Sequence, residues 1–330
     1  MRFQTCRFAL LAPFYIDDKF MKGYFTVNTS VDIIEKDNIF LNHVADGKHP
    51  NMAIFLSGVG SNAEKLLADK SVINAADPVV LITDAPEKSK AGAIGKKYNI
   101  PVEEFSIREF YRSHGLKSIS LASAEGRRVR ELWTDELRKR IKKYNIDFAV
   151  LAGFEPLSNI TDDFPCLNVH PGDLSVVNSD GVRLYVGLHN RPVEAAILAG
   201  ETTLRASVII AQSFSNADKD MDNGLLLGVS QSMPIEFEGL TLDELKKIHA
   251  NRPERKPSGG WNDALEALAL RSQNSLKVCG DHVILPLVVR DFARKCFACQ
   301  SGKLYYRQDF SAEFKEVISN EYASDGKRII

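Results

Sequence analysis

The sequence predicts an open α/β fold, in which a mostly parallel, Rossmann-like sheet carries helices on both faces. Short aliphatic runs alternate with amphipathic helical segments from residue 52 onward, and this alternation is typical of parallel strands joined by crossover helices. The chain has 330 residues, enough to bury a sizeable core in one elaborated domain. The runs that we expect to form central strands are residues 52–57, 79–83, 147–152 and 166–170.

The pattern of apolar, polar and charged residues changes several times along the chain. These changes predict how the chain is divided into segments. Residues 1–50 read as an N-terminal extension of short strands, residues 51–310 as the main domain, and residues 311–330 as a C-terminal tail. Two segments look like insertions into the main domain. We expect a hairpin at residues 175–186 and a helical insertion with a charged loop at residues 236–278.

The clearest helix lies between the second and third of these strands, where apolar residues recur at three- and four-residue steps. These residues are Val129, Leu132, Trp133, Leu137 and Ile141. Further helices are predicted at residues 240–248, around 264–270 and at about 282–299, with a strand-like run at 304–306. Cys296-Phe-Ala-Cys299 has the spacing of a zinc or redox pair, but no second Cys or His pair accompanies it, so we expect core thiols within the last helix.

Composition excludes several classes of function. The chain has 42 basic and 43 acidic residues, a formal charge of −1, so it lacks the basic excess of a nucleic-acid binder. No apolar run approaches the roughly 20 residues that cross a bilayer, so no membrane contact is expected. Five cysteines, an odd number in a large chain, fit a reducing compartment. We therefore expect a cytoplasmic protein.

Asn168 and His170 follow a short apolar run and stand at the carboxyl end of the fourth predicted strand. Side chains two residues apart on a strand point to the same side, and ligands of open α/β sheets bind at this edge. An amide can stabilise an oxyanion, and an imidazole can carry a proton. A lone buried histidine more often only fills the core, so the prediction depends on the neighbouring Asn168 and on the Pro-Gly turn that follows.

A carboxylate partner for His170 is expected from residues 221–224, Met-Asp-Asn-Gly. A carboxylate beside an imidazole favours the protonated ring, so Asp222 would complete acyl-transfer machinery that has no protein nucleophile. Asp-Asn-Gly is also ordinary turn chemistry, and Asp218 and Asp220 lie close by. On the sequence alone, any one of the three aspartates can be the partner.

A glycine-containing loop at residues 57–62 joins the first predicted strand to a helix. Glycines allow close approach of the backbone to a ligand, and a helix start presents free N–H groups to an anion. The loop therefore fits either an anion site or a tight turn, and the spacing of Ser61 and Glu64 also fits a capping box. It lacks the full dinucleotide pattern and the P-loop lysine, so neither NAD nor ATP is favoured.

Taken in chain order, these pieces resemble the folate-dependent formyltransferases, most closely those of the phosphoribosylglycinamide formyltransferase type. The similarity extends from about residue 52 to residue 306. Each motif is modest, but the ordered set is specific. The motifs are Ser-Gly-Val-Gly-Ser-Asn at 57–62, Leu-Ala-Gly-Phe at 151–154, Leu-Asn-Val-His-Pro at 167–171, Gly-Leu-His at 187–189, Met-Asp-Asn-Gly at 221–224 and Asp-His-Val-Ile-Leu-Pro-Leu-Val at 281–288.

The resemblance implies formyl transfer from 10-formyltetrahydrofolate to a small, phosphorylated amine such as glycinamide ribonucleotide, as in purine biosynthesis, without a metal. Asn168, His170 and Asp222 match the family's catalytic trio, with His170 as the proton donor. The phosphate end of the amine would bind Gly60, Ser61 and Asn62, and its ribose would lie near Asp281. The folate pocket would be lined by Arg130, Glu155, Pro156, Leu157, Ser158 and Asn168. A monomer or a homodimer is expected.

The chain departs from the family's pattern at several points. Asn223 stands where the family has Gly or Thr, and Pro156 stands where it has Arg. The connection between His170 and His189 is longer than usual and reads as a hairpin that turns at residues 180–181, beside the site. The amine acceptor can therefore differ from glycinamide ribonucleotide.

Other functions are compatible with the same motifs. A formyltetrahydrofolate deformylase would use water in place of the amine, but such relatives lack the Gly-Ser-Asn loop. Formylation of a sugar-nucleotide amine uses a similar trio, whereas formylation of methionyl-tRNA calls for a basic face that the charge balance does not supply. A catalytically degenerate binding protein is the non-enzymatic alternative.

Overall fold

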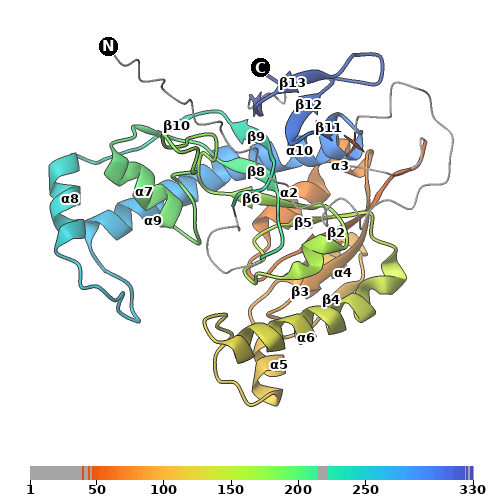
Figure 1. Cartoon of the computed structure of the whole chain (residues 1–330), viewed down its shortest axis with the longest axis horizontal. Helices are drawn as coiled ribbons and strands as arrows, with labels where there is room; N and C mark the ends of the chain where they lie inside the picture. The colour runs from red at the N-terminus through yellow and green to blue at the C-terminus, as the bar shows by residue number, and fades with distance from the viewer. Residues whose placement is uncertain are drawn as a thin grey trace, which may run out of the picture.

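The computed structural model describes residues 39–40, 44, 47–214, 222–323, 325 and 328–329 (Figure 1). Most of the expected N-terminal extension therefore lies outside the described residues. Its only described strand is β1 (Ile39–Phe40), which pairs with a strand near the C-terminus. The segment 215–221, which includes Asp218 and Asp220, also lies outside them.

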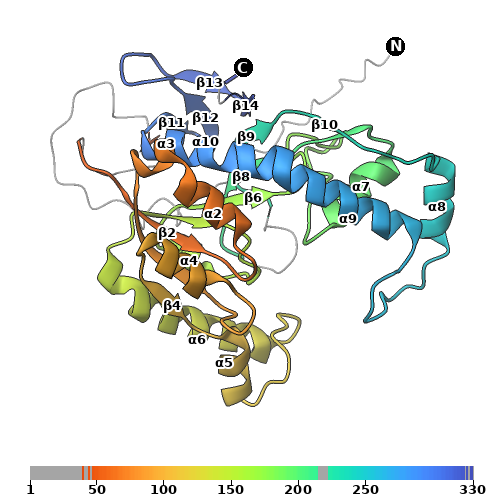
Figure 2. The same cartoon turned by 180° about the vertical axis from the view of Figure 1, so that it is seen from behind.

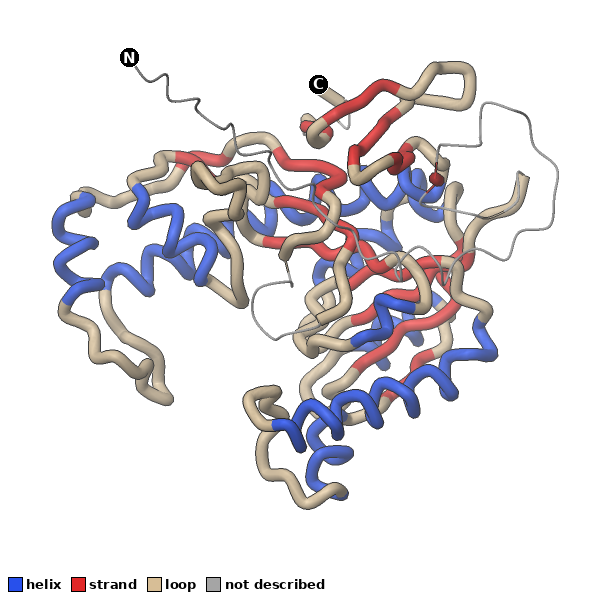
Figure 3. The backbone as a smooth tube through the Cα atoms, viewed as in Figure 1, coloured by secondary structure: helices blue, strands red, loops and turns tan. Residues whose placement is uncertain are grey.

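An open sheet of eight strands forms the centre of the molecule (Figure 3). Strand β8 is antiparallel to both of its neighbours, and the other adjacent strands pair in parallel. This mostly parallel sheet, with all four predicted strand runs in it, confirms the predicted fold class. The strands, in spatial order, are β14 (Asn320–Tyr322), β9 (Leu226–Ser230), β8 (Ser207–Ile210), β6 (Cys166–His170), β5 (Phe148–Leu151), β2 (Asn51–Phe55), β3 (Asp77–Thr83) and β4 (Val102–Glu104).

Helices cover both faces of this sheet (Figures 1 and 2). One face carries α2 (Ser61–Ala68), α3 (Lys70–Ile73), α4 (Ala91–Tyr98) and α10 (His282–Ala293). The other carries α5 (Ile107–Ser113) and α6 (Ala124–Ile141), the helix predicted most clearly. Val129, Trp133 and Leu137 of α6 are fully buried, so most of the predicted apolar stripe is the face that packs on the sheet. Leu132, which was assigned to the same stripe, is 37% exposed, because it lies one residue to the side of the buried face.

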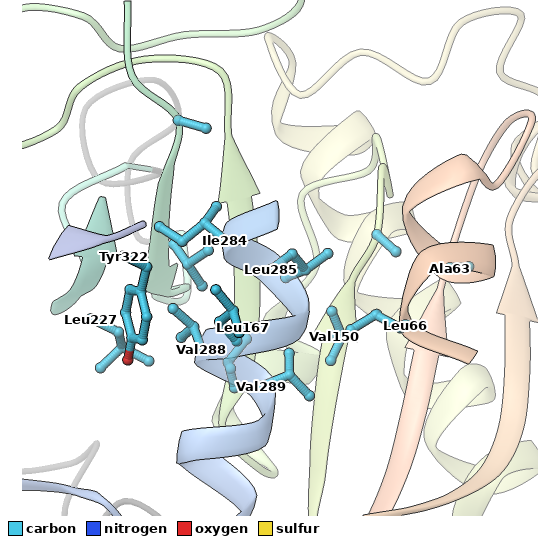
Figure 4. Close-up of a cluster of buried hydrophobic side chains, with 14 of the residues drawn as sticks. Ala63, Leu66, Val150, Leu167, Leu227, Ile284, Leu285, Val288, Val289 and Tyr322 are labelled. Carbon is cyan, nitrogen blue, oxygen red and sulfur yellow. The ribbon is translucent and has the colours of Figure 1, made fainter. Parts of the chain in front are cut away.

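Helix α10 forms the core directly behind the strand that carries Asn168 and His170. Leu285 and Val289 pack toward Leu167 of β6 and Val150 of β5 (Figure 4). These side chains are between 0% and 1% exposed. Close packing of this kind leaves little room for movement, so the carboxyl end of β6 is a rigid support for a site.

A helical lobe extends from one end of the sheet (Figures 1 and 3). It contains α7 (Arg191–Ala199), α8 (Leu242–Ala250) and α9 (Ala264–Leu276). Thr241 and Glu244 form a capping box at the start of α8, which confirms that predicted helix. Helix α9 is longer than the expected 264–270 and continues through a π-turn (Lys277–Asp281) into α10. The described residues contain no helix with the length and apolar character of a membrane span.

Smaller elements complete the fold. A second sheet has the order β1, β11 (Phe297–Gln300), β12 (Lys303–Tyr306) and β13 (Lys315–Val317), and β7 (Thr203–Leu204) pairs with β10 (Met233–Pro234). Two 3₁₀ turns are η2 (Lys142–Tyr144) and η3 (Asn159–Asp162). Residues 311–330, expected as a tail, contribute β13 and the sheet-edge strand β14. They are therefore part of the fold.

The prediction of one helix over 282–299 is wrong at its C-terminal end. Helix α10 ends at Ala293, and Lys295 adopts a left-handed backbone conformation with φ of 55°. That conformation stops the helix and turns the chain into β11, because an L-residue in it cannot continue a right-handed helix. Cys296 and Cys299 are buried free thiols before and within this strand, and burial raises the pKa of Cys296 to about 12.

Candidate active site

A cavity of about 400 Å³ opens at the carboxyl ends of the central strands. It is lined by three of the segments that the sequence singled out, the loop at residues 58–62, the segment at 151–158 and the end of β6. The residues of the predicted site that line it are Gly60, Ser61, Asn62, Glu155, Pro156, Leu157, Ser158, Asn168, His170, Asp222 and Asp281. A volume of this size is in the usual range for small-molecule sites, roughly 300–1,000 Å³.

His170 and Asp222 form a buried pair at one wall of this cavity. The distance from His170 Nδ1 to Asp222 Oδ1 is 3.4 Å, and the two side chains are 3% and 4% exposed. The other carboxylate oxygen, Oδ2, accepts a hydrogen bond of 2.8 Å from the backbone N–H of Gly187. On the other side of the ring, His170 Nε2 lies 2.7 Å from the carbonyl oxygen of Tyr185.

The electrostatic balance at Asp222 favours the carboxylate. Burial raises the pKa of the Asp222 carboxyl, but the hydrogen bond and charge of His170, the N–H of Gly187 and the charge of Arg183 together bring it below its ordinary value. Asp222 is therefore an anion at neutral pH. An anionic partner favours the protonated form of an adjacent imidazole.

Asn168 reaches the cavity because of its position on β6. It pairs with Leu151 of β5 on one side and with Ile209 of β8 on the other, so its backbone is held within the sheet. Asn168 and His170 both line the cavity, as the two-residue spacing predicted. An amide N–H on a fixed backbone can stabilise negative charge on a ligand oxygen without prior rearrangement.

The loop before α2 does not form the capping box that Ser61 and Glu64 suggested. The N-cap of α2 is Gly60, with φ of 70° and no side-chain cap, and Glu64 instead forms an ion pair with Lys97. The positive φ favours glycine at this position, and a Cβ atom at Gly60 would also lie 2.5 Å from the side-chain end of Ile94, which would have to move. The hydroxyl of Ser61 is left buried without a hydrogen-bond partner.

Several buried polar atoms of the cavity lack partners within the described part of the chain. They are Ser61 Oγ, Asn62 Oδ1 and Asp281 Oδ1. An unpaired buried polar atom costs roughly 1–3 kcal/mol, and the three in this cavity are available to polar groups of a ligand. Burial raises the pKa of the Asp281 carboxyl to about 6, against the hydrogen bond from Asn62 and the charges of Lys277 and His170.

Arg130, expected from the resemblance to line the folate pocket, is not among the residues that line the cavity. The side chain is 3% exposed, and its guanidinium donates hydrogen bonds to the carbonyl oxygens of Leu157, at 2.5 Å, and Ile119, at 2.9 Å. Helix α6 directs this side chain inward, beneath the segment it was expected to flank. Its structural effect is to hold the backbone of residues 155–158 in place.

Some cavity residues were not identified from the sequence. Gln273, Asn274 and Lys277 reach the cavity from α9 and the π-turn, and Leu188 reaches it from the loop before α7. Gln273 also donates a hydrogen bond of 2.9 Å to the carbonyl oxygen of His189, so α9 holds that loop. The four-residue spacing of 273, 277 and 281 was the available signal, but it was missed because the helix was predicted to end near residue 270.

The fold is shared with known structures. The chain has the formyltransferase fold, and its structure resembles that of phosphoribosylglycinamide formyltransferase from Anaplasma phagocytophilum with a TM-score of 0.53. That match is 16% identical and covers 84% of this chain and 100% of the other. The enzyme of the same name from Coxiella burnetii matches with a TM-score of 0.50 at 20% identity, over 79% of this chain and 95% of the other.

The sequence is similar to one particular enzyme of that class. Phosphoribosylglycinamide formyltransferase, chloroplastic, from Arabidopsis thaliana is 30% identical over 215 residues, which is 61% of this chain. The chain spans 63% of the length of that relative. No family model matches the chain. The resemblance to the folate-dependent formyltransferases of the phosphoribosylglycinamide formyltransferase type is thus confirmed.

Proposed function

We propose that this chain is an enzyme that transfers a formyl group from 10-formyltetrahydrofolate to the primary amine of a small phosphorylated substrate. One observation carries the proposal. The buried His170–Asp222 pair and Asn168 line the same cavity as the loop at residues 60–62 and the segment at residues 155–158. The cavity thus brings together the proposed anion site, the proposed folate-binding segment and the acid–base groups.

Each residue has a role in this reaction. The amine nitrogen attacks the formyl carbon, and the carbonyl oxygen becomes an oxyanion that the Asn168 amide and His170 stabilise. The bond from the formyl carbon to N10 of the folate then breaks. The proton lost by the amine reaches N10 by way of water and His170, whose Nε2 must first leave the carbonyl oxygen of Tyr185, while Asp222 orients the imidazole through Nδ1. No protein nucleophile is required.

The acceptor is proposed to be phosphorylated because of the groups at the start of α2. The left-handed Gly60 opens a helix of eight residues, whose first N–H groups and dipole favour an anion. The unpaired hydroxyl of Ser61 adds a donor. Across the cavity, the carboxyl of Asp281 has an unpaired oxygen that can accept a hydrogen bond from a substrate hydroxyl. Glycinamide ribonucleotide presents both groups, as would a related sugar phosphate amine.

The proposal is tested by incubating the purified protein with 10-formyltetrahydrofolate and a panel of amines that begins with glycinamide ribonucleotide. Release of tetrahydrofolate is followed by absorbance, and the formylated amine is identified by mass spectrometry. We expect both products in equal amounts. Release of tetrahydrofolate without any amine would identify a hydrolase instead, and no release with any amine would refute formyl transfer.

A further inference from the structure

The hairpin at residues 175–186 folds over the His170–Asp222 pair. A bridge between Val177 and Arg183 and a hydrogen bond of 3.1 Å from Leu184 N–H to the Val176 carbonyl oxygen join its two arms. The side chain of Asn178 closes its turn by accepting hydrogen bonds of 2.9 Å from the N–H groups of residues 180 and 182. The hairpin is therefore an ordered element.

The hairpin contacts both members of the pair. The Tyr185 carbonyl oxygen faces Nε2 of His170, and the Arg183 guanidinium donates a hydrogen bond from Nη1 to the backbone carbonyl oxygen of Asp222. A Cβ atom at Gly172 would lie 2.6 Å from that Tyr185 carbonyl oxygen, so only glycine lets the hairpin approach this closely. The phenol of Tyr185 is held in turn by Glu201, at 2.6 Å.

These contacts bear on the proton that His170 carries. Nδ1 faces the Asp222 carboxylate and Nε2 faces the Tyr185 carbonyl oxygen, so each ring nitrogen has an acceptor. The protonated ring satisfies both acceptors, whereas a neutral ring leaves one of them opposite a lone pair. Arg183 acts in the opposite direction, because a second positive charge beside the pair makes the protonated state less favourable.

We propose that Arg183 is a positioning residue that fixes the peptide of Asp222 and sets the pH at which the His170–Asp222 pair releases its proton. Two observations support it. The guanidinium is partly buried, where its charge is weakly screened, and its described hydrogen bond is to Asp222 itself. The role of Arg183 in catalysis rests on the proposed function. Its effect on the protonation of the His170–Asp222 pair does not.

Other charged or titratable groups near the pair are unchanged in sequence in the Arg183 variants. They therefore contribute to the midpoint of the wild-type protein and of the variants alike. These groups are Asp281 and Lys277 of the π-turn, His189 before α7, and Asp173 and Glu201 near Tyr185.

The first test needs no substrate. The imidazole resonances of His170 are titrated by NMR in the wild-type protein and in the Arg183→Met and Arg183→Lys variants, with assignment by loss of the signal in His170→Asn. We expect the midpoint to move upward by about half a pH unit to one unit in Arg183→Met, because a nearby positive charge is lost. Arg183→Lys, which keeps the charge, should stay near the wild-type midpoint.

A matched control is Val182→Thr, which changes an exposed neighbour on the same hairpin. Its midpoint should equal that of the wild-type protein, and all variants should keep the wild-type circular dichroism spectrum and melting temperature to within a few degrees. An unchanged midpoint in Arg183→Met, or an equal shift in Val182→Thr, would overturn the proposal. Arg183→Gln repeats the test with a neutral donor if the methionine variant fails to fold.

The second test uses formyl transfer. Arg183→Met should lower kcat about tenfold and change KM for the amine less than twofold, because the side chain does not line the cavity. The alkaline limb of the kcat profile should move to higher pH by the same amount as the NMR midpoint. If the wild-type protein transfers no formyl group, the proposed function fails, but the NMR test still decides whether Arg183 sets the protonation of the pair.

Discussion

The strand ends and the inserted segments contribute to the same cavity in different ways. The end of β6 carries Asn168 and His170, the groups proposed for oxyanion and proton chemistry, on backbone that the sheet holds between β5 and β8. The inserted hairpin reaches the site through the carbonyl of Tyr185 and the guanidinium of Arg183. The strand thus fixes where the side chains of Asn168 and His170 lie, while the hairpin supplies a carbonyl oxygen and a charge beside the His170–Asp222 pair.

The central sheet and the helical lobe of α7, α8 and α9 also differ in how they are stabilised. The sheet is held by apolar packing, of which Leu167 and Val289 are fully buried members. The helical lobe shares this apolar cluster through residues such as Leu245 and Leu268, and it also contains an ion-pair group. In that group Arg252 joins Glu194 of α7 to Asp263 at the start of α9 and lies over the ring of Trp261. Changes in the two regions should therefore produce different kinds of effect, and four substitutions test this.

The largest effect is expected at the sheet edge. His170→Asn should lower kcat by roughly 10²-fold or more, because general acid–base catalysis is lost, and it should leave the fold intact. His249→Ala changes an exposed histidine of α8 and serves as the control. Steady-state kinetics of both variants make the comparison. Equal activity of wild-type protein and His170→Asn would show that the strand end carries no catalytic group.

Arg252→Met should destabilise the lobe by about 2–3 kcal/mol, because it leaves two partly buried carboxylates without their partner. Hydrogen exchange followed by mass spectrometry should then speed up in α7, α8 and α9 but not in β5 or β6. Uniform acceleration across the chain would mean that the lobe and the sheet unfold as one unit.

Asp281→Asn should stabilise the free protein at alkaline pH and weaken substrate binding. Burial raises the pKa of Asp281 to about 6 in the folded state, from 3.8 in the unfolded chain, so the unfolded state loses the proton first. The wild-type free energy of unfolding should therefore fall between about pH 4 and pH 6, and Asp281→Asn removes that fall. Above pH 6 we expect the variant to be more stable by about 3 kcal/mol.

Chemical denaturation at pH 5 and pH 8 measures this difference, and steady-state kinetics should show a raised KM for the amine. Asp291→Asn is not a suitable control, since Asp291 accepts hydrogen bonds from Tyr306 and Tyr322. Asp243→Asn, on the exposed side of α8, is a better one. A pH dependence that is the same in Asp281→Asn and in the wild-type protein would contradict the prediction.

The smallest effect is expected at the start of α2. Ser61→Ala should raise KM for a phosphorylated amine about five- to tenfold, which corresponds to the roughly 1 kcal/mol of one hydrogen bond. Stability should not fall, because the hydroxyl has no partner in the free protein. An unphosphorylated analogue should show no change in KM. A fall in melting temperature would show instead that Ser61 supports the helix.

Local features of the chain were predictable because they depend on neighbouring residues. The alternation of strands 52–57, 79–83, 147–152 and 166–170 with helices indicated the sheet, and three- and four-residue steps indicated α6. Helix ends were less predictable. Helix α10 ends before Lys295, where neither glycine nor proline marks the turn, and the extent of α9 follows from its continuation into the π-turn.

The candidate site was predictable in part for the same reason. Asn168 and His170 are two residues apart on one strand, and Gly60 and Ser61 lie in one turn, so their positions follow from local geometry. The position of Arg130 did not follow, since the direction of its side chain depends on how α6 packs against the segment that contains Leu157.

By itself the sequence determined the α/β class and the strand and turn that hold Asn168, His170 and the loop at residues 60–62, because periodicity and turn chemistry act over a few residues. Only the tertiary structure decided that Asp222 contacts His170, that Asp281 is buried in the same cavity, and that the hairpin lies over the pair. Those contacts join residues far apart in the chain, and packing of the whole fold determines them.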